Sequence, residues 1–288
     1  MATCGLFGVS RQVYYRSKKR RIKKQDLSVR VIELVTGMRM KMPRVGTRKL
    51  YHMLKESLEP LQIGRDKLFR IMKANHLLIK PKRSYHITTD SHHRFRKHKD
   101  LTIDMKVNRP EQLWVSDITY LGNRKEPCYL ALVTDAYSKM IVGYDVSDSL
   151  SMEGSIRALK MALSARRYKR EKLIHHSDRG LQYCCEEYQR ILNKNSVRCS
   201  MTESYDPYRN AVAERVNGIL KQEFIPVRVG IRISEMKKIV SESVNIYNNI
   251  RPHHACFMNT PKYMHRQSKI KIRTYKRKNS SQSELAAT

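Results

Sequence analysis

The chain has 288 residues, of which 40% are hydrophobic and 29% charged, so it is long enough to bury the core of one large domain and of a smaller one. Its 58 Lys and Arg exceed its 26 Asp and Glu by a formal net charge of +32. This excess favours nucleic acid as a partner over an acidic membrane surface or ribosome-type packing. The sequence has no long apolar run and no apolar signal segment, which argues against a membrane span and predicts a soluble, cytoplasmic protein.

The N-terminal third is basic and lacks alternating strand patterns. Residues 1–107 contain 27 Lys and Arg against 8 Asp and Glu, a net charge of +19. Gly8 and Ser10 predict a turn and an N-cap before a short helix over 8–16, a pattern compatible with the second helix of a helix-turn-helix. Two further amphipathic helices are predicted over 46–57 and 64–78. Their apolar stripe consists of Leu50, Leu54, Leu68, Ile71 and Met72.

Composition divides the chain into four parts. Residues 1–80 form a basic helical region, either a DNA-binding unit or an ordinary small bundle with a solvated charged face. Residues 81–108 are polar and basic, as in a linker that follows a phosphate backbone. The core is expected over 109–266, and residues 267–288 form a basic tail that we expect to be disordered.

Three strands in succession open the core. They are predicted over 112–121, 127–137 and 139–148, with a tight turn at Ser138 and Lys139. Helices and strands then alternate, with helices over 151–167, 180–194, 211–224 and 234–250 and strands over 172–178 and 197–202. This order predicts an α/β fold in which helices pack on a mixed five-stranded sheet.

Three acids lie at matching places in this pattern. Asp117 is within the apolar first strand, Asp178 ends the fourth, and Glu214 is in the first turns of the helix after the fifth. A carboxylate in an apolar strand is costly unless it is paired or binds a cation.

Each acid also has a structural interpretation. Asp178 before a glycine suits a turn or cap, Glu214 beside Arg215 suits a solvated helix pair, and Asp117 suits a salt bridge. Asp135 and Asp145 are further acids at strand ends, and the pattern alone does not exclude them.

Carboxylates that meet at one opening suit Mg²⁺ or Mn²⁺, which take oxygen ligands. Two such ions, about 4 Å apart, activate a water or a DNA 3′-hydroxyl and stabilise the leaving oxygen of an in-line phosphoryl transfer. The three acids therefore predict a two-metal site without a covalent protein nucleophile.

Four segments resemble the catalytic core of insertion-sequence transposases of the IS-three family, specifically their OrfB product, within the retroviral-integrase-like DDE group. They are LWVSDITYL, YLALVTDAYSKMIVGYDVSDSL, LIHHSDRGLQY and DPYRNAVAERVNGILKQEF, and 35 residues separate Asp178 from Glu214. Upstream, GVSRQVYYR and VGTRKLYHMLKE resemble the helix-turn-helix-like segment of these proteins. Downstream, YNNIRPHHACFMNTPKYM resembles their closing element. The family often has an acid where this chain has Arg209.

The resemblance implies a ribonuclease-H-like fold with Asp117, Asp178 and Glu214 as catalytic, metal-binding residues. It also implies a bacterial, nucleoid-associated protein that acts on element ends and target DNA as a homo-oligomer, often as a fusion with OrfA or beside it. His176, Ser177, Arg179 and Gly180 fall in the signature around the second acid. We expect DNA contacts from Lys221, Arg179, Asn210, Arg11, Arg48, Lys49, Arg65 and Lys67.

The expected function is therefore metal-dependent cleavage and strand transfer of insertion-sequence ends. Two alternatives stay open. One is a non-catalytic nucleic-acid-binding or regulatory remnant of such a transposase, and the other is a ribonuclease-H-type hydrolase acting on RNA in a hybrid.

Overall fold

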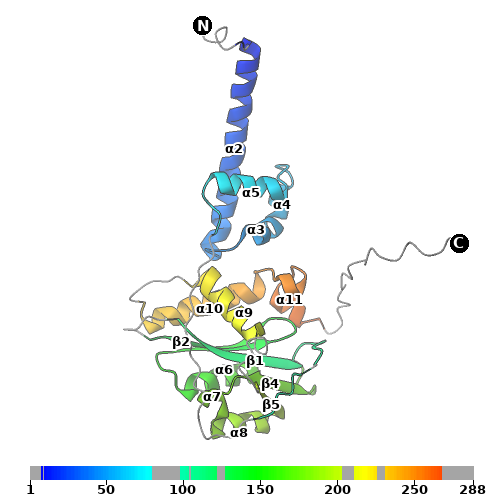
Figure 1. Cartoon of the computed structure of the whole chain (residues 1–288), viewed down its shortest axis with the longest axis vertical. Helices are drawn as coiled ribbons and strands as arrows, with labels where there is room; N and C mark the ends of the chain where they lie inside the picture. The colour runs from blue at the N-terminus through cyan, green and yellow to red at the C-terminus, as the bar shows by residue number, and fades with distance from the viewer. Residues whose placement is uncertain are drawn as a thin grey trace, which may run out of the picture.

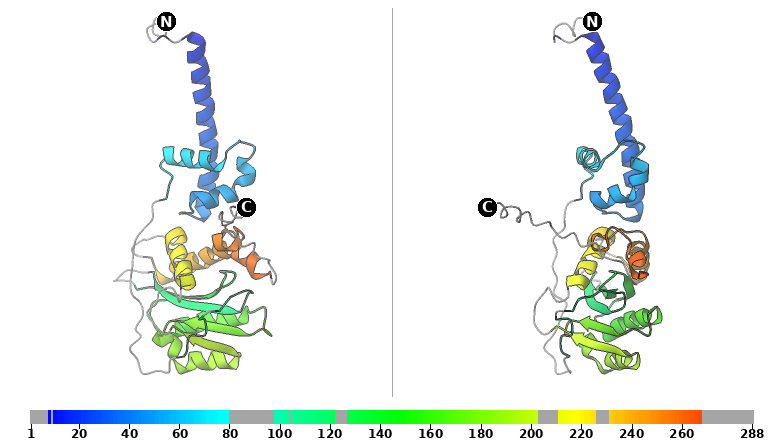
Figure 2. Two further views of the ribbon diagram at one scale, coloured as in Figure 1. Left: turned by 45° about the vertical axis from the view of Figure 1, so that its right-hand side comes forward. Right: turned by 90° about the vertical axis from the view of Figure 1, so that its right-hand side faces the viewer.

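A computed structural model describes residues 8, 10–79, 98–103, 105–121, 127–202, 211–225 and 231–267. N-terminal helices stand on a layered α/β core, and α9, α10 and α11 lie between those helices and the sheet (Figures 1 and 2). Most of the predicted linker, Asn210, Arg209 and nearly all of the predicted tail lie outside the described residues.

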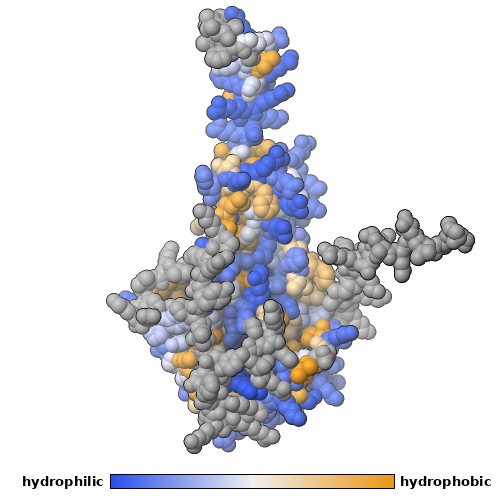
Figure 3. Space-filling model, in the orientation of Figure 1, coloured by the Kyte–Doolittle hydropathy of each residue, from blue (hydrophilic) through white to orange (hydrophobic). Residues whose placement is uncertain are grey.

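The first helix is much longer than the short helix predicted over 8–16. α2 (Arg11–Lys41) begins where the Ser10 hydroxyl accepts a hydrogen bond from the Val13 amide at 3.3 Å. No proline interrupts the next 31 residues, and the helix stops just before Pro43. Every residue from Ser10 to Asp26 is exposed, and this half of α2 is largely hydrophilic (Figure 3).

Three short helices pack against the second half of α2. They are α3 (Thr47–Met53), α4 (Lys55–Leu58) and α5 (Arg65–Ala74). Four members of the predicted apolar stripe are buried and Ile71 is partly buried, and they share a cluster with Val31 and Val35 of α2. The stripe therefore folds the region into a small helical unit.

The core contains a mixed five-stranded sheet in the order β3-β2-β1-β4-β5. β1, β2 and β3 pair antiparallel, and β4 and β5 continue the sheet parallel to β1. Their bounds are β1 (Leu113–Tyr120), β2 (Tyr129–Asp135), β3 (Ile141–Ser147), β4 (Leu173–Ser177) and β5 (Val197–Met201). This is the mixed five-stranded sheet that the sequence pattern predicts, in the ribonuclease-H-like arrangement that the family resemblance implies.

Helices cover both faces of the sheet. α6 (Met152–Ser164), α7 (Leu181–Cys184) and α8 (Glu186–Lys194) pack with Trp114 and Ile118 on one face. The single helix expected over 180–194 is thus two helices, because Cys185 has an extended backbone (ψ 148°).

The other face carries the C-terminal helices. α9 (Ala211–Ile219) continues into a π-helical turn, η1 (Leu220–Phe224), and α10 (Ile233–Asn249), η2 (His254–Cys256) and α11 (Pro261–His265) follow. Leu113 and Val115 of β1 pack with Ala213 of α9. Because alternate residues of a strand share a face, Asp117 lies on this side with them.

The N-terminal helices and the C-terminal side of the core share one apolar cluster, which runs from Val31 through Leu50 to Val216 and Tyr247. The Arg44 amide also donates to the Glu223 carbonyl at 3.2 Å. Within the described segments no helix is both long enough and apolar enough to cross a membrane.

Candidate active site

Asp117 and Asp178 lie at the same level on neighbouring parallel strands. The register pairs Leu113 with Ile174 and Val115 with His176, so the same offset carries Asp117 to Asp178, directly after β4. Neighbouring strands are about 4.8 Å apart. The sheet therefore brings together two acids that lie far apart along the chain.

Asp117 is held from the opposite layer by α9. The Asn217 side-chain amide donates to Asp117 Oδ2 at 2.7 Å, and Asn217 is only 4% exposed. Among the described atoms the Asn217 carbonyl oxygen has no hydrogen-bond partner. Asn217 was not predicted from the sequence, although it follows Glu214 by three residues and so shares its helix face.

Asp178 also serves the turn that was its alternative interpretation. The Gly180 amide donates to Asp178 Oδ1 at 3.1 Å, and α7 begins at the next residue. A Cβ at Gly180 would approach Asp178 Oδ1 to 3.1 Å. The turn therefore fixes one carboxylate oxygen at the end of β4.

Glu214 is exposed in the first turn of α9. Desolvation raises its pKa. The described residues include no ion pair between Glu214 and Arg215, so the structure does not support the solvated-pair interpretation.

The charges of Asp178 and Glu214 both act on Asp117. The pKa of Asp117 is raised from 3.8 to about 7, first by desolvation and then by the charges of Asp178 and Glu214, against the opposing hydrogen bond from Asn217. Such an uncompensated carboxylate is the donor chemistry that a hard divalent cation matches. The residues present therefore fit a divalent metal.

The three acids do not, however, form a single group of metal ligands in the structure. In the part of the chain that the structure describes, no three His, Cys, Asp or Glu side chains are grouped closely enough to hold a metal. A complete three-carboxylate site would need the three acids to come closer together.

The sequence predicts a regular α-helix over 211–224, which would place Lys221 two turns beyond Glu214. In the structure Lys221 lies in the π-helical turn η1. Desolvation lowers its pKa, and the charge of Asp117 opposes this shift. The Lys221 ammonium and the Asp117 carboxylate therefore attract each other electrostatically. Arg179 is half-buried next to Asp178.

Asp135 and Asp145 are paired elsewhere. Asp135 accepts hydrogen bonds from the Glu111 and Ser138 amides, each at 2.7 Å, and lies 3.7 Å from His265. Asp145 forms a 2.8 Å ion pair with Arg157. These contacts give both acids a structural role, which the sequence pattern alone could not show.

The predicted N-terminal DNA contacts have different environments. Arg11 and Arg48 are exposed, whereas Arg65 pairs with Asp66 at 2.9 Å and Lys67 Nζ lies 3.5 Å from the Gln62 carbonyl. The Lys49 ammonium is 2.7 Å from Glu223 Oε1, at the junction with the core.

A second polar network, also not predicted, lies on the opposite face of β1. The fully buried His175 ring contacts Ser116 Oγ at 2.7 Å and the Tyr188 hydroxyl at 2.9 Å. Burial lowers the pKa of His175 to about 3, so this network holds a neutral imidazole and ties α8 to β1.

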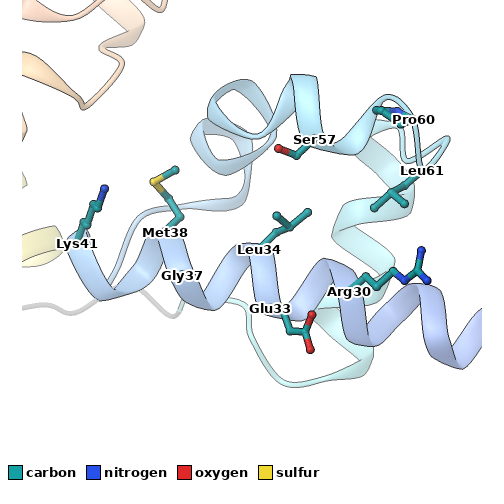
Figure 4. A pocket seen from close by; sticks show the side chains of 9 residues that line it. All are labelled: Arg30, Glu33, Leu34, Gly37, Met38, Lys41, Ser57, Pro60 and Leu61. Atoms are coloured by element: carbon teal, nitrogen blue, oxygen red, sulfur yellow. The ribbon is translucent and has the colours of Figure 1, made fainter.

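A cavity of roughly 630 Å³ lies in the N-terminal region between α2 and the end of α4 (Figure 4). Leu34, Met38 and Leu61 line it beside Arg30 and Glu33. It is remote in sequence and structure from the acids, so it is not their substrate cleft.

The chain matches the integrase core domain family over residues 107–207 and again over residues 195–261. It is 32% identical over 260 residues to the insertion element IS600 uncharacterized 31 kDa protein of Shigella sonnei, which covers 88% of this chain and 93% of that protein. It is 34% identical over 154 residues to the transposase InsF for insertion sequence IS3A of Escherichia coli, covering 53% of each, so this alignment spans about half of InsF.

Among solved structures, the catalytic core domain of HTLV-2 integrase in complex with magnesium aligns with a TM-score of 0.43 and 17% identity, over 55% of this chain and 97% of that one. The sequence relationship is the stronger one, because it extends over nearly all of the IS600 protein. The chain belongs to the IS3 family of insertion-sequence transposases, which carry an integrase core domain.

Proposed function

We propose that the protein is a DNA transposase that cleaves insertion-sequence ends and joins them to target DNA by metal-dependent phosphoryl transfer. The observation that carries this proposal is the desolvated Asp117 carboxylate, next to Asp178 and within the field of Glu214, on an integrase core.

In this proposal Asp117, Asp178 and Glu214 would hold Mg²⁺ or Mn²⁺, and two ions suit the three acids. When bound, such ions activate the attacking oxygen and stabilise the leaving oxygen. Asn217 orients the Asp117 carboxylate through its 2.7 Å hydrogen bond. The Gly180 amide fixes Asp178 in the same way, so both aspartates are positioned before any ion arrives.

DNA would be positioned by the basic N-terminal region, since phosphate contacts orient a duplex without reading its sequence. We propose the exposed Arg11 and Arg48 as contacts of this kind, and Lys221, Arg179 and Asn210 as further contacts from the core. The helical region, residues 1–80, would bind DNA and the core, residues 109–266, would catalyse. A multimeric synaptic complex and an OrfA-type partner complete the proposal.

The test is cleavage and strand transfer on an element-end oligonucleotide, with and without EDTA. Asp117→Asn, Asp178→Asn and Glu214→Gln should each lower the rate by a factor of at least about 100, the scale of a lost electrostatic contribution, while DNA binding survives. Asp66→Asn, which removes an exposed acid paired only with Arg65, is the matched control and should keep the wild-type rate. Near-wild-type joining by any of the first three variants would remove that residue from the site.

A second candidate is a DNA-binding protein whose acids no longer catalyse. It is favoured by the observation that, among the described residues, no three possible metal ligands form one group. Undiminished DNA binding with no cleavage in Mg²⁺ or Mn²⁺ would support this candidate against the first. Preferential cleavage of an RNA strand in a hybrid would instead indicate a ribonuclease-H-type hydrolase.

A further inference from the structure

A basic cavity lies beside α9, and none of the three acids is among the residues that line it. Its volume is roughly 420 Å³, many times the ~30 Å³ that a water occupies in the liquid. The N-terminal region, the turn after β2, α9 and the segment after α10 each contribute to its wall. The polar lining consists of Lys49, Lys139, Arg215, Arg251, His253 and His254.

The cavity has more Lys and Arg side chains than carboxylates that pair with them. Glu223 accepts both Lys49 at 2.7 Å and the Arg251 guanidinium, whose Nε and Nη2 donate at 2.8 Å each. Lys139 Nζ donates to the Ala136 carbonyl, and the described ion pairs include none for Lys139 or Arg215. Glu223 thus pairs with two of the four cations, whereas Lys139 is half-buried and Arg215 is exposed, and this excess of positive charge attracts an anion.

His253 supplies a second, independent observation. Its side chain lines the cavity and is only 7% exposed. The Ala255 amide donates to His253 Nδ1 at 3.2 Å, so the ring proton is assigned to Nε2. Within the described structure that Nε2–H group has no hydrogen-bond partner.

The His253 ring is neutral, so it is a donor and not a further cation. Desolvation first, and then the charges of Arg251, Lys139, Lys49 and Arg215, lower its pKa to about 3. An unsatisfied buried donor among cations is complementary to an anionic oxygen acceptor and repels a metal ion.

We propose that this cavity binds a phosphate group, with Arg215, Lys139 and the His253 Nε2–H as its donors and Glu223 holding Lys49 and Arg251 in place. The phosphate belongs to a DNA backbone, and this choice of source rests on the proposed function. Arg215 and Glu214 are consecutive on α9 and so lie about 100° apart around the helix. A strand phosphate in the cavity would therefore be fixed on the helix that carries the third acid.

The first arm measures thermal unfolding of the full chain in phosphate and in chloride at equal ionic strength. Phosphate should raise the unfolding temperature of the wild type above its value in chloride, because it binds only the folded state. Arg215→Gln should lose most of this shift, and Arg215→Lys should recover part of it. Arg190→Gln, which removes an exposed arginine from α8 on the other face of the sheet, should keep it. An equal phosphate shift in the wild type and Arg215→Gln would overturn the site.

The second arm measures duplex binding in EDTA, where failure of the metal chemistry has no effect. Arg215→Gln and Lys139→Gln should each lower the slope of log K against log salt by about 0.9, the contribution of one phosphate contact. Arg190→Gln should leave the slope unchanged. Equal losses in all three variants would overturn the DNA assignment. A phosphate shift that depends on Arg215 without any change in the DNA slope would keep the site and assign it to a small phosphate anion.

Discussion

Ionisation of the Asp117 carboxylate destabilises the folded chain. Desolvation and the neighbouring acids raise its pKa to about 7, whereas the pKa of an Asp in an unfolded chain is about 3.9. An acid that binds its proton more tightly when folded favours folding at low pH. Its contribution to stability then falls as the pH rises from about 4 to about 7 and stays low above that.

Asp117→Asn should therefore stabilise the protein at about pH 8 and have little effect near pH 4. The upper bound of the gain is about 4 kcal/mol, since each pKa unit corresponds to about 1.4 kcal/mol. Mg²⁺ should stabilise the wild type at about pH 8 and not the variant. Free energies of unfolding from urea titrations at both pH values measure these effects.

Asp145→Asn is the matched control, because Asp145 is paired with Arg157 at 2.8 Å. This variant should be neutral or slightly destabilising at about pH 8. Parallel pH profiles of unfolding for the wild type and Asp117→Asn would contradict the electrostatic account of the site.

At the residue scale the sequence could nominate acids but not rank them. Asp117, Asp135 and Asp145 all lie in or at the end of strands, and only their partners distinguish them. Asp135 accepts hydrogen bonds from two amides and also contacts His265. Burial lowers the pKa of His265, but hydrogen bonds to Asp135 and Glu111 outweigh burial and raise it to about 9. Those partners come from distant parts of the chain, which local patterns do not reveal.

At the scale of elements, β3 and α6 approach closely at one position. A Cβ built on Gly143 would overlap the Ala158 carbonyl oxygen and would also meet Ala162 of α6. The obstructing atoms belong mainly to a helix backbone, which cannot rotate away. Glycine at this position therefore sets the distance between the sheet and α6.

Gly143→Ala should lower the free energy of unfolding by about 2 kcal/mol, as overpacked core substitutions do. Gly37→Ala, inside α2 where nothing lies within 4 Å of the added Cβ, should instead raise it by up to about 1 kcal/mol through helix propensity. Chemical denaturation of the two variants measures the difference. A neutral Gly143→Ala would show that α6 is free to move away from the sheet.

The element order was predictable, and the errors occurred where helices continue or break. The five strands and the helices α5, α6 and α10 follow from apolar periodicity, which tertiary packing reinforces. The helix predicted over 8–16 continues to Lys41, because no proline breaks it and Gly37 within it costs only about 1 kcal/mol. Cys185 separates α7 from α8 without any glycine or proline at the break, so no local signal marked it.

At the scale of the whole molecule, the first half of α2 stands away from the other helices and strands (Figure 1), and it is rich in positive charge. Between Arg11 and Lys24 the helix has eight Lys and Arg and no acid. All of these residues are exposed. This segment is therefore available to contact a phosphate backbone at several points.

Duplex binding should weaken steeply as salt rises, because each phosphate contact releases counterions. Replacing Lys18, Lys19 and Lys23 with Gln should lower the slope of log K against log salt by up to about 2.7. The control replaces the same number of exposed lysines around α8 and the turn before β4, namely Lys169, Lys172 and Lys194. Fluorescence anisotropy over a salt series measures both slopes, and equal losses would show that charge acts without regard to position.

The π-helical turn after α9 has an implication for insertions and deletions. A π turn accommodates one residue more than an α turn, and this one, Leu220–Phe224, includes Glu223. Deleting a single residue before Glu223 in this turn would convert it to an α turn and would keep the orientation of Glu223 relative to Glu214. Deleting two residues would rotate Glu223 by about 100° relative to Glu214, away from Arg251 and Lys49, although every side chain that makes these contacts would still be encoded. The turn therefore tolerates the loss of one residue, but not of two, before the contacts of Glu223 with the amino-terminal helices are lost.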